Sequence, residues 1–366
     1  MRRKLLKNLD WGVLICIAVL LGVGMFALFS TSQNTNHNEF FKQLQWVAIS
    51  IPFFVAFILI DYDKILKIAP VLYGACIFLL ILVLFTHEIN GARSWFKLGP
   101  LSLQPSEFAK IMMIISFARL VDYFKSKDKL NKISSLTLIL LFIAVPLALI
   151  IKQPDYGTAM VLLVMGIMMI FVAGIKWRYV ISATIFACIS VPLAYHFVLP
   201  QHAKDRIMVF LNPQIDPRGK GYNVIQSKLA VGSGKLWGMG LFNGNQTQLG
   251  ILPMKTTDFI YSVISEEMGF IISVSVILLF ILLIIKIINI ARNAKDLYGT
   301  LICVGVAAMF LAHFTENVGM TMGLLPITGI PLPFISYGGS AMLTNLIALG
   351  LALNVGTRKQ KLSFLE

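Results

Sequence analysis

Three carboxylates lie in the segment PMKTTDFIYSVISEEMGF (Pro253–Phe270), and their spacing could support acid–base or metal chemistry. Asp258 stands where a long polar loop gives way to an apolar helix, and Glu266 and Glu267 follow at greater depth. A charged side chain at full membrane depth costs about 2.5–3.5 kcal/mol, and less near the interface. A segment that keeps three such groups therefore indicates a use for them. For Asp258 alone a plain alternative stays open, because the helix dipole favours an acidic residue at a helix N-terminus.

Glu107 and Lys110 form a second polar group, within the segment GARSWFKLGPLSLQPSEFAK. Proline is tolerated in the first turn of a helix, so a helix is expected to begin at Pro105 and to carry both side chains on one face. A paired Glu and Lys is far less costly at membrane depth than either charge alone, whether the pair fixes helix packing or takes part in chemistry. Arg93 precedes a tryptophan by two residues. Its guanidinium could bind phosphate at the level of the lipid headgroups.

Two further polar clusters follow in the sequence. In QPDYGTA, Asp155 lies in a very short turn, where we expect it to cap the N-terminus of the next helix. In HFTENVG, the side chains of His313, Glu316 and Asn317 share one helical face, so they are predicted to point into the bundle and away from lipid.

The stretch Pro326–Gly339 contains several prolines and glycines and is predicted to break the helix at the membrane surface. Irregular backbone at that depth is tolerated only where protein or a water-filled cavity covers it. Ser336, Tyr337 and Ser340 are expected to line such a cavity. Four polar segments from distant parts of the chain thus converge on one face of the membrane, which predicts a cavity on the external side.

Composition identifies the class of protein. Hydrophobic residues make up 57% of the chain and charged residues 13%, and the mean hydropathy is +0.81. Soluble domains carry about 25% charged residues, so we expect an all-α polytopic membrane protein. Ten apolar runs are long enough to cross a bilayer of about 30 Å: 11–30, 44–60, 68–86, 106–124, 136–151, 156–173, 179–199, 259–285, 300–325 and 334–356. The first is expected to be a retained span and not a removed signal peptide.

The distribution of Lys and Arg predicts the orientation. With the N-terminus inside, the inside segments hold 19 basic residues, against 4 in the short outside segments. Both termini are therefore predicted to be cytoplasmic, and the long loop 200–257 external. We expect one membrane domain over residues 1–366. Basic residues are dispersed among loops, so nucleic-acid binding is not expected. All four cysteines lie in apolar runs and are expected to be small buried hydrophobic residues (Cys16, Cys76, Cys188 and Cys303).

The loop 200–257 has an unusual composition. It holds seven basic residues against two acidic ones, and eight glycines. The stretch GYNVIQSKLAVG within it predicts an amphipathic helix. A cationic, glycine-rich cap beside the membrane suits a ligand that carries phosphates on a lipid tail. The alternative is a solvated loop that only covers the bundle.

The long ordered motifs resemble those of the SEDS family (shape, elongation, division and sporulation) along almost the whole chain. They are GARSW…QPSEFAK, QPDYGTA, DPRGKGYNVIQSKLAVGSG, LPMKTTDFIYSVISEEMGF and NVGMTMGLLPITGIPLPFISYGGS. The segment GNQTQLGILP is similar to the RodA-like elongation branch more than to the FtsW-like division branch.

The resemblance implies a peptidoglycan glycosyltransferase of ten spans, which polymerises lipid II on the outer face of the bacterial cytoplasmic membrane. It implies a class B penicillin-binding protein transpeptidase and other elongation-complex membrane proteins as partners, and a divalent cation (Mg or Mn) with no organic cofactor. The family's essential aspartate falls on Asp258, its Glu and Lys of the fourth span on Glu107 and Lys110, and its arginine after the third span on Arg93. The remaining residues that we assign to substrate binding are Asp155, Arg206, Gln226, Ser227, Thr257, Glu266, Asn317, Ser336, Tyr337 and Ser340. Lys255 and Glu316 are less usual for the family.

Two roles for Asp258 are open. It could deprotonate the acceptor hydroxyl, while Arg93, Lys110, Arg206 and a metal ion hold the departing diphosphate and the anomeric centre inverts. The helix dipole should lower the pKa of Asp258 and weaken it as a base, so metal binding by Asp258 is an alternative.

Two other classes of function compete with the enzyme. A lipid-precursor flippase would also use intramembrane charges, but the polar clusters gather on one face and no matching pair of interrupted helices marks two halves. A non-catalytic scaffold for a penicillin-binding protein predicts that Asp258 is dispensable.

Overall fold

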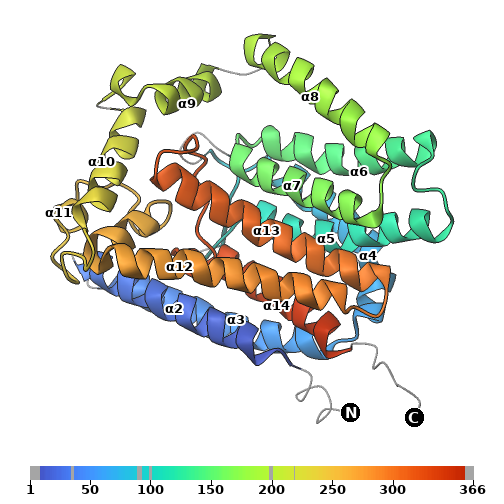
Figure 1. Ribbon diagram of the computed structural model, residues 1–366, viewed down its shortest axis with the longest axis horizontal. Coiled ribbons are helices and arrows are strands. Elements are labelled where there is room, and N and C mark those ends of the chain that lie inside the picture. The colour runs from blue at the N-terminus through green and yellow to red at the C-terminus, as the bar shows by residue number, and fades with distance from the viewer. Residues whose placement is uncertain are drawn as a thin grey trace.

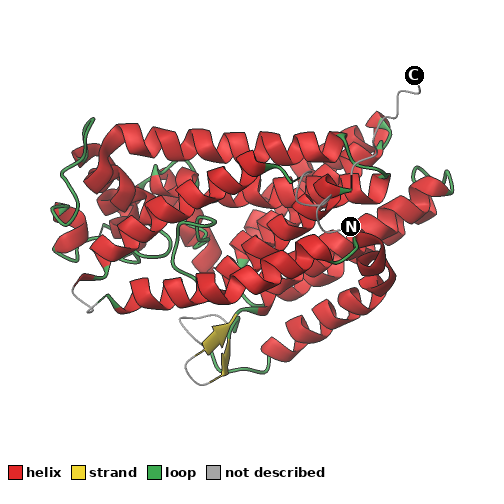
Figure 2. Cartoon of the chain, turned by 90° about the horizontal axis from the view of Figure 1, so that it is seen from below, coloured by secondary structure: helices red, strands yellow, loops and turns green. Residues whose placement is uncertain are grey.

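The computed structural model describes residues 9–33, 37–88, 93–98, 101–197, 201–217 and 219–358. Within these ranges the protein is a bundle of long helices that run side by side along one direction (Figures 1 and 2). Several residues used in the sequence predictions lie outside the described ranges: Arg2, Arg3, Lys4, Lys7, Gly91, Arg218, Lys359 and Lys361.

Ten long helices coincide with the ten predicted spans, which confirms the all-α polytopic class. They are α2 (Trp11–Thr31), α3 (Asn38–Leu59), α4 (Tyr62–Val83), α5 (Pro105–Ser126), α6 (Ile133–Ile151), α7 (Tyr156–Ala173), α8 (Trp177–Phe197), α12 (Ile260–Arg292), α13 (Leu297–Thr321) and α14 (Gly339–Thr357). Nine of these, all but α5, are long and apolar enough to cross a membrane. Helix α5 begins at Pro105 as predicted, but it carries Glu107, Lys110, Arg119, Asp122 and Lys125. The chain is an integral membrane protein, and the count of ten spans stays a prediction.

Helices α13 and α14 form the core of the bundle. Every residue of α14 from Ser340 to Thr357 is buried, and the helix packs against α3, while α13 packs against α7 and α12. Small residues permit this close packing. At Gly350 of α14, for example, a Cβ atom would lie 2.9 Å from the carbonyl oxygen of Phe54 in α3.

Helix α8 differs from the others, because none of the described side chains in its apolar stretch is buried. In Figure 1 it lies apart from the main body of the bundle. Cys188 lies on this helix and is exposed, whereas Cys16, Cys76 and Cys303 are buried. The prediction that all four cysteines are buried is therefore wrong for Cys188, since the helix that carries it has little protein around it.

The long loop is largely helical. It contains α9 (Gln201–Leu211), the 3₁₀-helix η2 (Pro213–Ile215), α10 (Lys220–Ser233) and α11 (Asn245–Gln248). Helix α10 confirms the predicted amphipathic helix. Helices α9 to α11 lie together at one end of the bundle, opposite the turn that joins α12 to α13 (Figure 1). We call this end the loop side. A hairpin of β1 (Phe96–Leu98) and β2 (Leu101–Leu103), which the sequence did not predict, pairs antiparallel just before α5.

Helix α12 is sharply bent at Gly269, whose φ of 79° and ψ of −177° are not helical. The hydroxyl oxygens of Ser265 and Ser273 are 3.0 Å apart, although eight residues span about 12 Å along a straight helix. The segment 260–268 therefore folds back on the start of the long segment 270–292. The predicted span 259–285 is thus interrupted at Gly269. Glu266 and Glu267 follow Asp258 by about two helical turns as predicted, but they lie at the bend and not deeper along a continuous helix.

Loop residues supply the hydrogen bonds that the bend removes from the helix. The amides of Met239 and Gly240 donate to the carbonyls of Glu266 (2.9 Å) and Glu267 (3.0 Å), and the amide of Phe270 donates to the carbonyl of Lys235 (2.9 Å). Such pairing satisfies backbone groups that hydrocarbon could not. The approach is so close that a Cβ atom on Gly269 would collide with the backbone nitrogen of Gly238.

Candidate active site

A cavity of about 320 Å³ lies on the loop side of the bundle, and segments from distant parts of the chain line it. Its titratable side chains are Asp258, Asp155, Arg206 and Tyr337. The predicted convergence of polar segments is thus present in the structure. The other residues that line the cavity are Ser94, Trp95, Gln104, Pro154, Thr257, Thr328, Gly329, Pro331, Gly338, Gly339, Ser340 and Ala341.

The backbone around Asp258 is held by side chains of the helix-breaking stretch and of α13. The amide of Asn317 donates to the carbonyl of Asp258 (2.9 Å) and to that of Ile330 (2.7 Å). The hydroxyl of Ser336 donates to the carbonyl of Thr257 (2.6 Å). Asn317 is fully buried and Ser336 nearly so, and neither lines the cavity. Both residues bind the backbone from outside the cavity, and their hydrogen bonds fix the position of the peptide that carries Asp258.

The pKa of Asp258 is raised, because burial removes its carboxylate from water. A hydrogen bond from Thr257 and the charge of Arg206 lower the pKa and only partly offset the burial. The expectation that the N-terminus of a helix would lower this pKa is therefore wrong, since desolvation outweighs it. Space is left beside the carboxylate by Gly329, where a Cβ atom would lie 3.5 Å from Oδ2 of Asp258.

Arg206 is the only cationic side chain among the residues that line this cavity. It projects from α9, and its Nη1 atom donates to the carbonyl of Ile327 (3.3 Å). This contact holds the guanidinium near the helix-breaking stretch. Its remaining donors are suited to an anionic group such as a phosphate.

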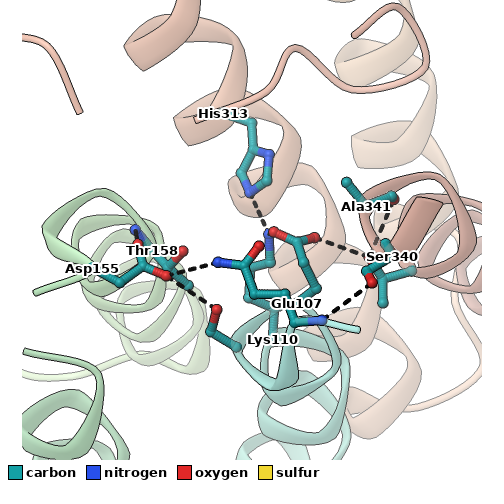
Figure 3. A network of polar contacts seen from close by, with 10 residues as sticks. Glu107, Lys110, Asp155, Thr158, His313, Ser340 and Ala341 are labelled. Atoms are coloured by element: carbon teal, nitrogen blue, oxygen red, sulfur yellow. Dashed lines mark hydrogen bonds and ion pairs between the residues drawn. The ribbon is translucent and has the colours of Figure 1, made fainter. Parts of the chain in front are cut away.

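Beneath the cavity, the ion pair predicted in α5 is present and fully buried (Figure 3). The Lys110 ammonium lies 2.8 Å from Oε1 of Glu107 and donates to Nε2 of His313 at 2.7 Å. An ammonium can only donate, so Nε2 accepts and the proton of the neutral ring is assigned to Nδ1. The other Glu107 oxygen accepts from the hydroxyl of Thr344 (3.1 Å). Lys110 therefore ties α5 to α13, and its ammonium does not line the cavity.

Asp155 caps α7 as predicted, with its Oδ1 atom accepting from the amide of Thr158 (3.1 Å). Its Oδ2 atom accepts from Gln104 (3.1 Å) and from the hydroxyl of Ser106 (3.0 Å), which connects the turn to the start of α5 (Figure 3). Asp155 lines the cavity, but both of its oxygens are engaged.

Besides Glu107, Lys110, Asn317 and Ser336, four more of the predicted site residues do not line the cavity. Arg93 is exposed and is 3.9 Å from Glu88. Gln226 and Ser227 belong to α10, and the hydroxyl of Ser227 contacts that of Ser262 (2.7 Å). Glu266 is fully buried and accepts from the amide (3.0 Å) and the hydroxyl (2.6 Å) of Thr247. Ser227 and Glu266 hold the loop against α12.

Ten of the lining residues were not among the predicted site residues, and three of these, Gln104, Thr328 and Gly329, lie beside the polar groups of the site. All three are uncharged and lie in irregular segments, so no charge or helical spacing distinguished them. The one available signal was their position in the sequence, since Gln104 precedes Pro105 and the other two lie in the helix-breaking stretch Pro326–Gly339. The sequence also did not predict that His313 is the second partner of Lys110, since 203 residues separate the two.

The fit of a divalent cation can be judged from the donors. The described part of the chain contains no group of three or more His, Cys, Asp or Glu side chains that could hold a metal. Mg²⁺, however, commonly takes only one or two carboxylates and completes its shell with water and substrate phosphates. Asp258 beside Gly329 meets that smaller requirement. The cavity therefore suits a cation that arrives with a phosphate-bearing substrate.

Comparison with known proteins agrees along nearly the whole chain. The model of the cell cycle protein family of FtsW, RodA and SpoVE matches residues 10–361. The chain is 32% identical to peptidoglycan glycosyltransferase RodA of Treponema pallidum (strain Nichols), over 98% of this chain and 100% of that protein. It is 34% identical to peptidoglycan glycosyltransferase MrdB of Escherichia coli (strain K12), over 97% and 95%.

Solved structures show the same fold. A chain in the structure described as "Structural coordination of polymerization and crosslinking by a peptidoglycan synthase complex" superposes with a TM-score of 0.82 at 30% identity, covering 95% of this chain and 97% of that one. The rod shape determining protein RodA of Thermus thermophilus superposes with a TM-score of 0.72 at 26% identity, covering 96% and 98%.

Proposed function

The chain belongs to the FtsW, RodA and SpoVE family of cell cycle proteins, the SEDS family, and from this membership we propose that it polymerises lipid II into glycan strands for cell elongation and rod shape. It is RodA-like and a peptidoglycan glycosyltransferase, the activity in the names of its relatives. Its membrane is the bacterial cytoplasmic membrane, its termini are cytoplasmic, and the Asp258 cavity opens to the external side.

One observation carries the proposal: Asp258 and Arg206 line the same cavity, and the peptide of Asp258 is fixed by Asn317 and Ser336. Asp258 accepts the proton of the acceptor sugar's 4-hydroxyl. The hydroxyl oxygen then bonds to the donor's anomeric carbon, while the bond from that carbon to the diphosphate oxygen breaks. The lipid diphosphate leaves with the electron pair, and the anomeric centre inverts.

The environment of Asp258 favours the general-base role. A base works best when its pKa lies near the working pH, and burial moves the pKa of Asp258 in that direction from the usual carboxyl range. Arg206 holds the departing diphosphate, where a guanidinium can bind two oxygens at once. Direct binding by Lys110 would require it to leave Glu107 and His313, so we assign to Lys110 the positioning of α5 against α13.

As the alternative to the general-base role, Asp258 would hold a divalent cation, Mg²⁺ or Mn²⁺, together with the substrate's phosphates, and the bound cation would neutralise charge on the diphosphate. A class B penicillin-binding protein is the proposed partner. The support for it is the related structure, in which a synthase complex coordinates polymerization with crosslinking. Other membrane proteins of the elongation complex are expected to join them.

The test uses the full chain with its transpeptidase partner in liposomes that contain labelled lipid II. The parent protein should form glycan strands, and Asp258→Asn should form none. Asp128→Asn makes the same chemical change at an exposed turn residue with φ of 53°, where Asn is well tolerated, and should retain full activity. Glycan formation by Asp258→Asn at the parent rate would overturn the general-base role. Lipid that crosses the membrane without polymerising would indicate a flippase.

A further inference from the structure

A second cavity lies at the bend of α12 and is larger than the one that contains Asp258, at about 550 Å³. Tyr261 and Ser265 of the folded-back segment line it on one side, and Ser273 and Ile277 of the long segment on the other. The rest of the wall is formed by Val231, Gly232, Lys235, Leu236, Phe270, Val274 and Met322. We call it the bend cavity.

The bend cavity is separate from the site of the proposed reaction. The two cavities share no lining residue. Ser227 lines neither cavity, and its hydroxyl joins α10 to α12 and α13, since it contacts Ser262 (2.7 Å) and donates to the carbonyl of Thr321 (2.7 Å). A molecule in the bend cavity is therefore not the sugar-bearing end of the reacting lipid.

The bend cavity opens toward lipid. Phe270 and Leu236, which line it, are 59% and 58% exposed. Phe270 begins the long segment of α12, and Ile277 lies about 10 Å further along the helix axis. The opening thus faces the hydrocarbon of the leaflet on the loop side. An apolar space of this kind is poorly hydrated and accepts apolar guests.

The rim of the bend cavity is positively charged. Lys235 is its only charged lining residue, and it is exposed. Lys235 lies in the turn after α10, where its backbone adopts a φ of 48°. This turn places the residue beside the opening. None of the lining residues is acidic. An amphiphile with a negatively charged head and one apolar chain fits both the wall and the rim.

We propose that the bend cavity binds one acyl chain of an anionic phospholipid from the loop-side leaflet, with the lipid phosphate at the ammonium of Lys235. The chain fills the space between the two arms of the bent helix and contacts Tyr261 and Ser265. Those residues follow Asp258 by one and two helical turns. The bound lipid therefore supports the folded-back segment that positions the aspartate.

The test measures lipids retained by the full chain with native mass spectrometry. The protein is exchanged into detergent with equal amounts of phosphatidylglycerol and phosphatidylcholine that carry the same acyl chains. The parent protein should retain phosphatidylglycerol in preference by about fivefold, the factor that one lysine beside an anionic headgroup supplies. Lys235→Gln should retain both lipids equally. Lys204→Gln, at a loop lysine that does not line the cavity, should keep the preference.

A second pair of variants tests the cavity itself. Val274→Trp fills it from a lining position, and should lose the retained lipid. Leu278→Trp adds the same bulk four residues on, at a position that is 59% exposed and outside the lining, and should retain lipid like the parent. Equal retention by Val274→Trp and the parent protein would overturn the proposal. A different result would be that the protein retains polyprenyl diphosphate in preference to phosphatidylglycerol and loses it in Val274→Trp. That result would overturn the assignment of a phospholipid to the bend cavity.

Discussion

Replacing Lys110 by Met is expected to destabilise the protein strongly, because it leaves the carboxylate of Glu107 buried without its cation. In the parent structure this carboxylate is 2.8 Å from the ammonium, and its other contact is the hydroxyl of Thr344 at 3.1 Å. Removing one partner of a buried ion pair costs about 3–5 kcal/mol. The double variant Glu107→Leu with Lys110→Met removes both charges and should recover at least half of that loss, since paired replacement by apolar residues is often neutral.

The cysteines of the chain provide the assay. Cys16, Cys76 and Cys303 are buried, whereas Cys188 is exposed. Cys16, Cys76 and Cys303 become accessible to a thiol-reactive fluorophore only on unfolding, so a melting curve can be recorded in detergent. The expected loss corresponds to a melting midpoint lower by about 5–10 °C. Lys127→Met, which removes an exposed lysine just beyond the same helix, should shift the midpoint by less than about 2 °C.

Two results would refute the reasoning. The first is a Lys110→Met protein that melts within about 2 °C of the parent, which is the limit set for the Lys127→Met control. The buried carboxylate of Glu107 would then be stable without its cation. The second is a double variant that melts lower than Lys110→Met, since the two side chains would then contribute independently and not as a pair.

Three further predictions follow from the aspartate and from the bend. Asp258→Asn should melt no lower than the parent at pH 7, because burial raises the pKa of Asp258 and the folded state is destabilised by its charge; a lower midpoint would contradict this. The acid limb of kcat/KM for lipid II polymerisation should lie above the usual carboxyl range, since activity falls as the pH drops through the raised pKa. Arg206→Gln should move that limb to higher pH, and an unchanged limb would show that Asp258 does not set it. Gly269→Ala should lower the melting midpoint by several degrees, because its Cβ atom would collide with Gly238, whereas Gly232→Ala, with open space around it, should not; equal midpoints would mean that the bend tolerates a side chain.

Local signals in the sequence were sufficient for much of the fold. The apolar runs predicted the long helices because a span needs about 20 apolar residues. Pro105 marked the start of α5, and Asp155 marked the cap of α7, since both effects act within one turn. The carboxylate Asp258 was found because a charge at the edge of an apolar helix is conspicuous.

Features that depend on distant contacts were not predictable in this way. The bend at Gly269 depends on backbone pairing with residues 235–240, and nothing in the apolar pattern of α12 marks it. The burial of Lys110 against His313 joins two helices whose register no local spacing specifies. Arg93 and Glu266 resembled site residues by charge, but their surroundings direct them to other contacts.

The bend in α12 also sets how the helix matches the thickness of the bilayer. As a straight rod, its 33 residues would extend about 50 Å, well beyond a hydrocarbon layer of about 30 Å. The arm from Phe270 to Arg292 alone extends about 35 Å, which a modest tilt accommodates. The nine residues 260–268 are therefore not needed to cross the membrane. They form a short buried arm that lies against the start of the long segment, and Asp258 lies just before this arm.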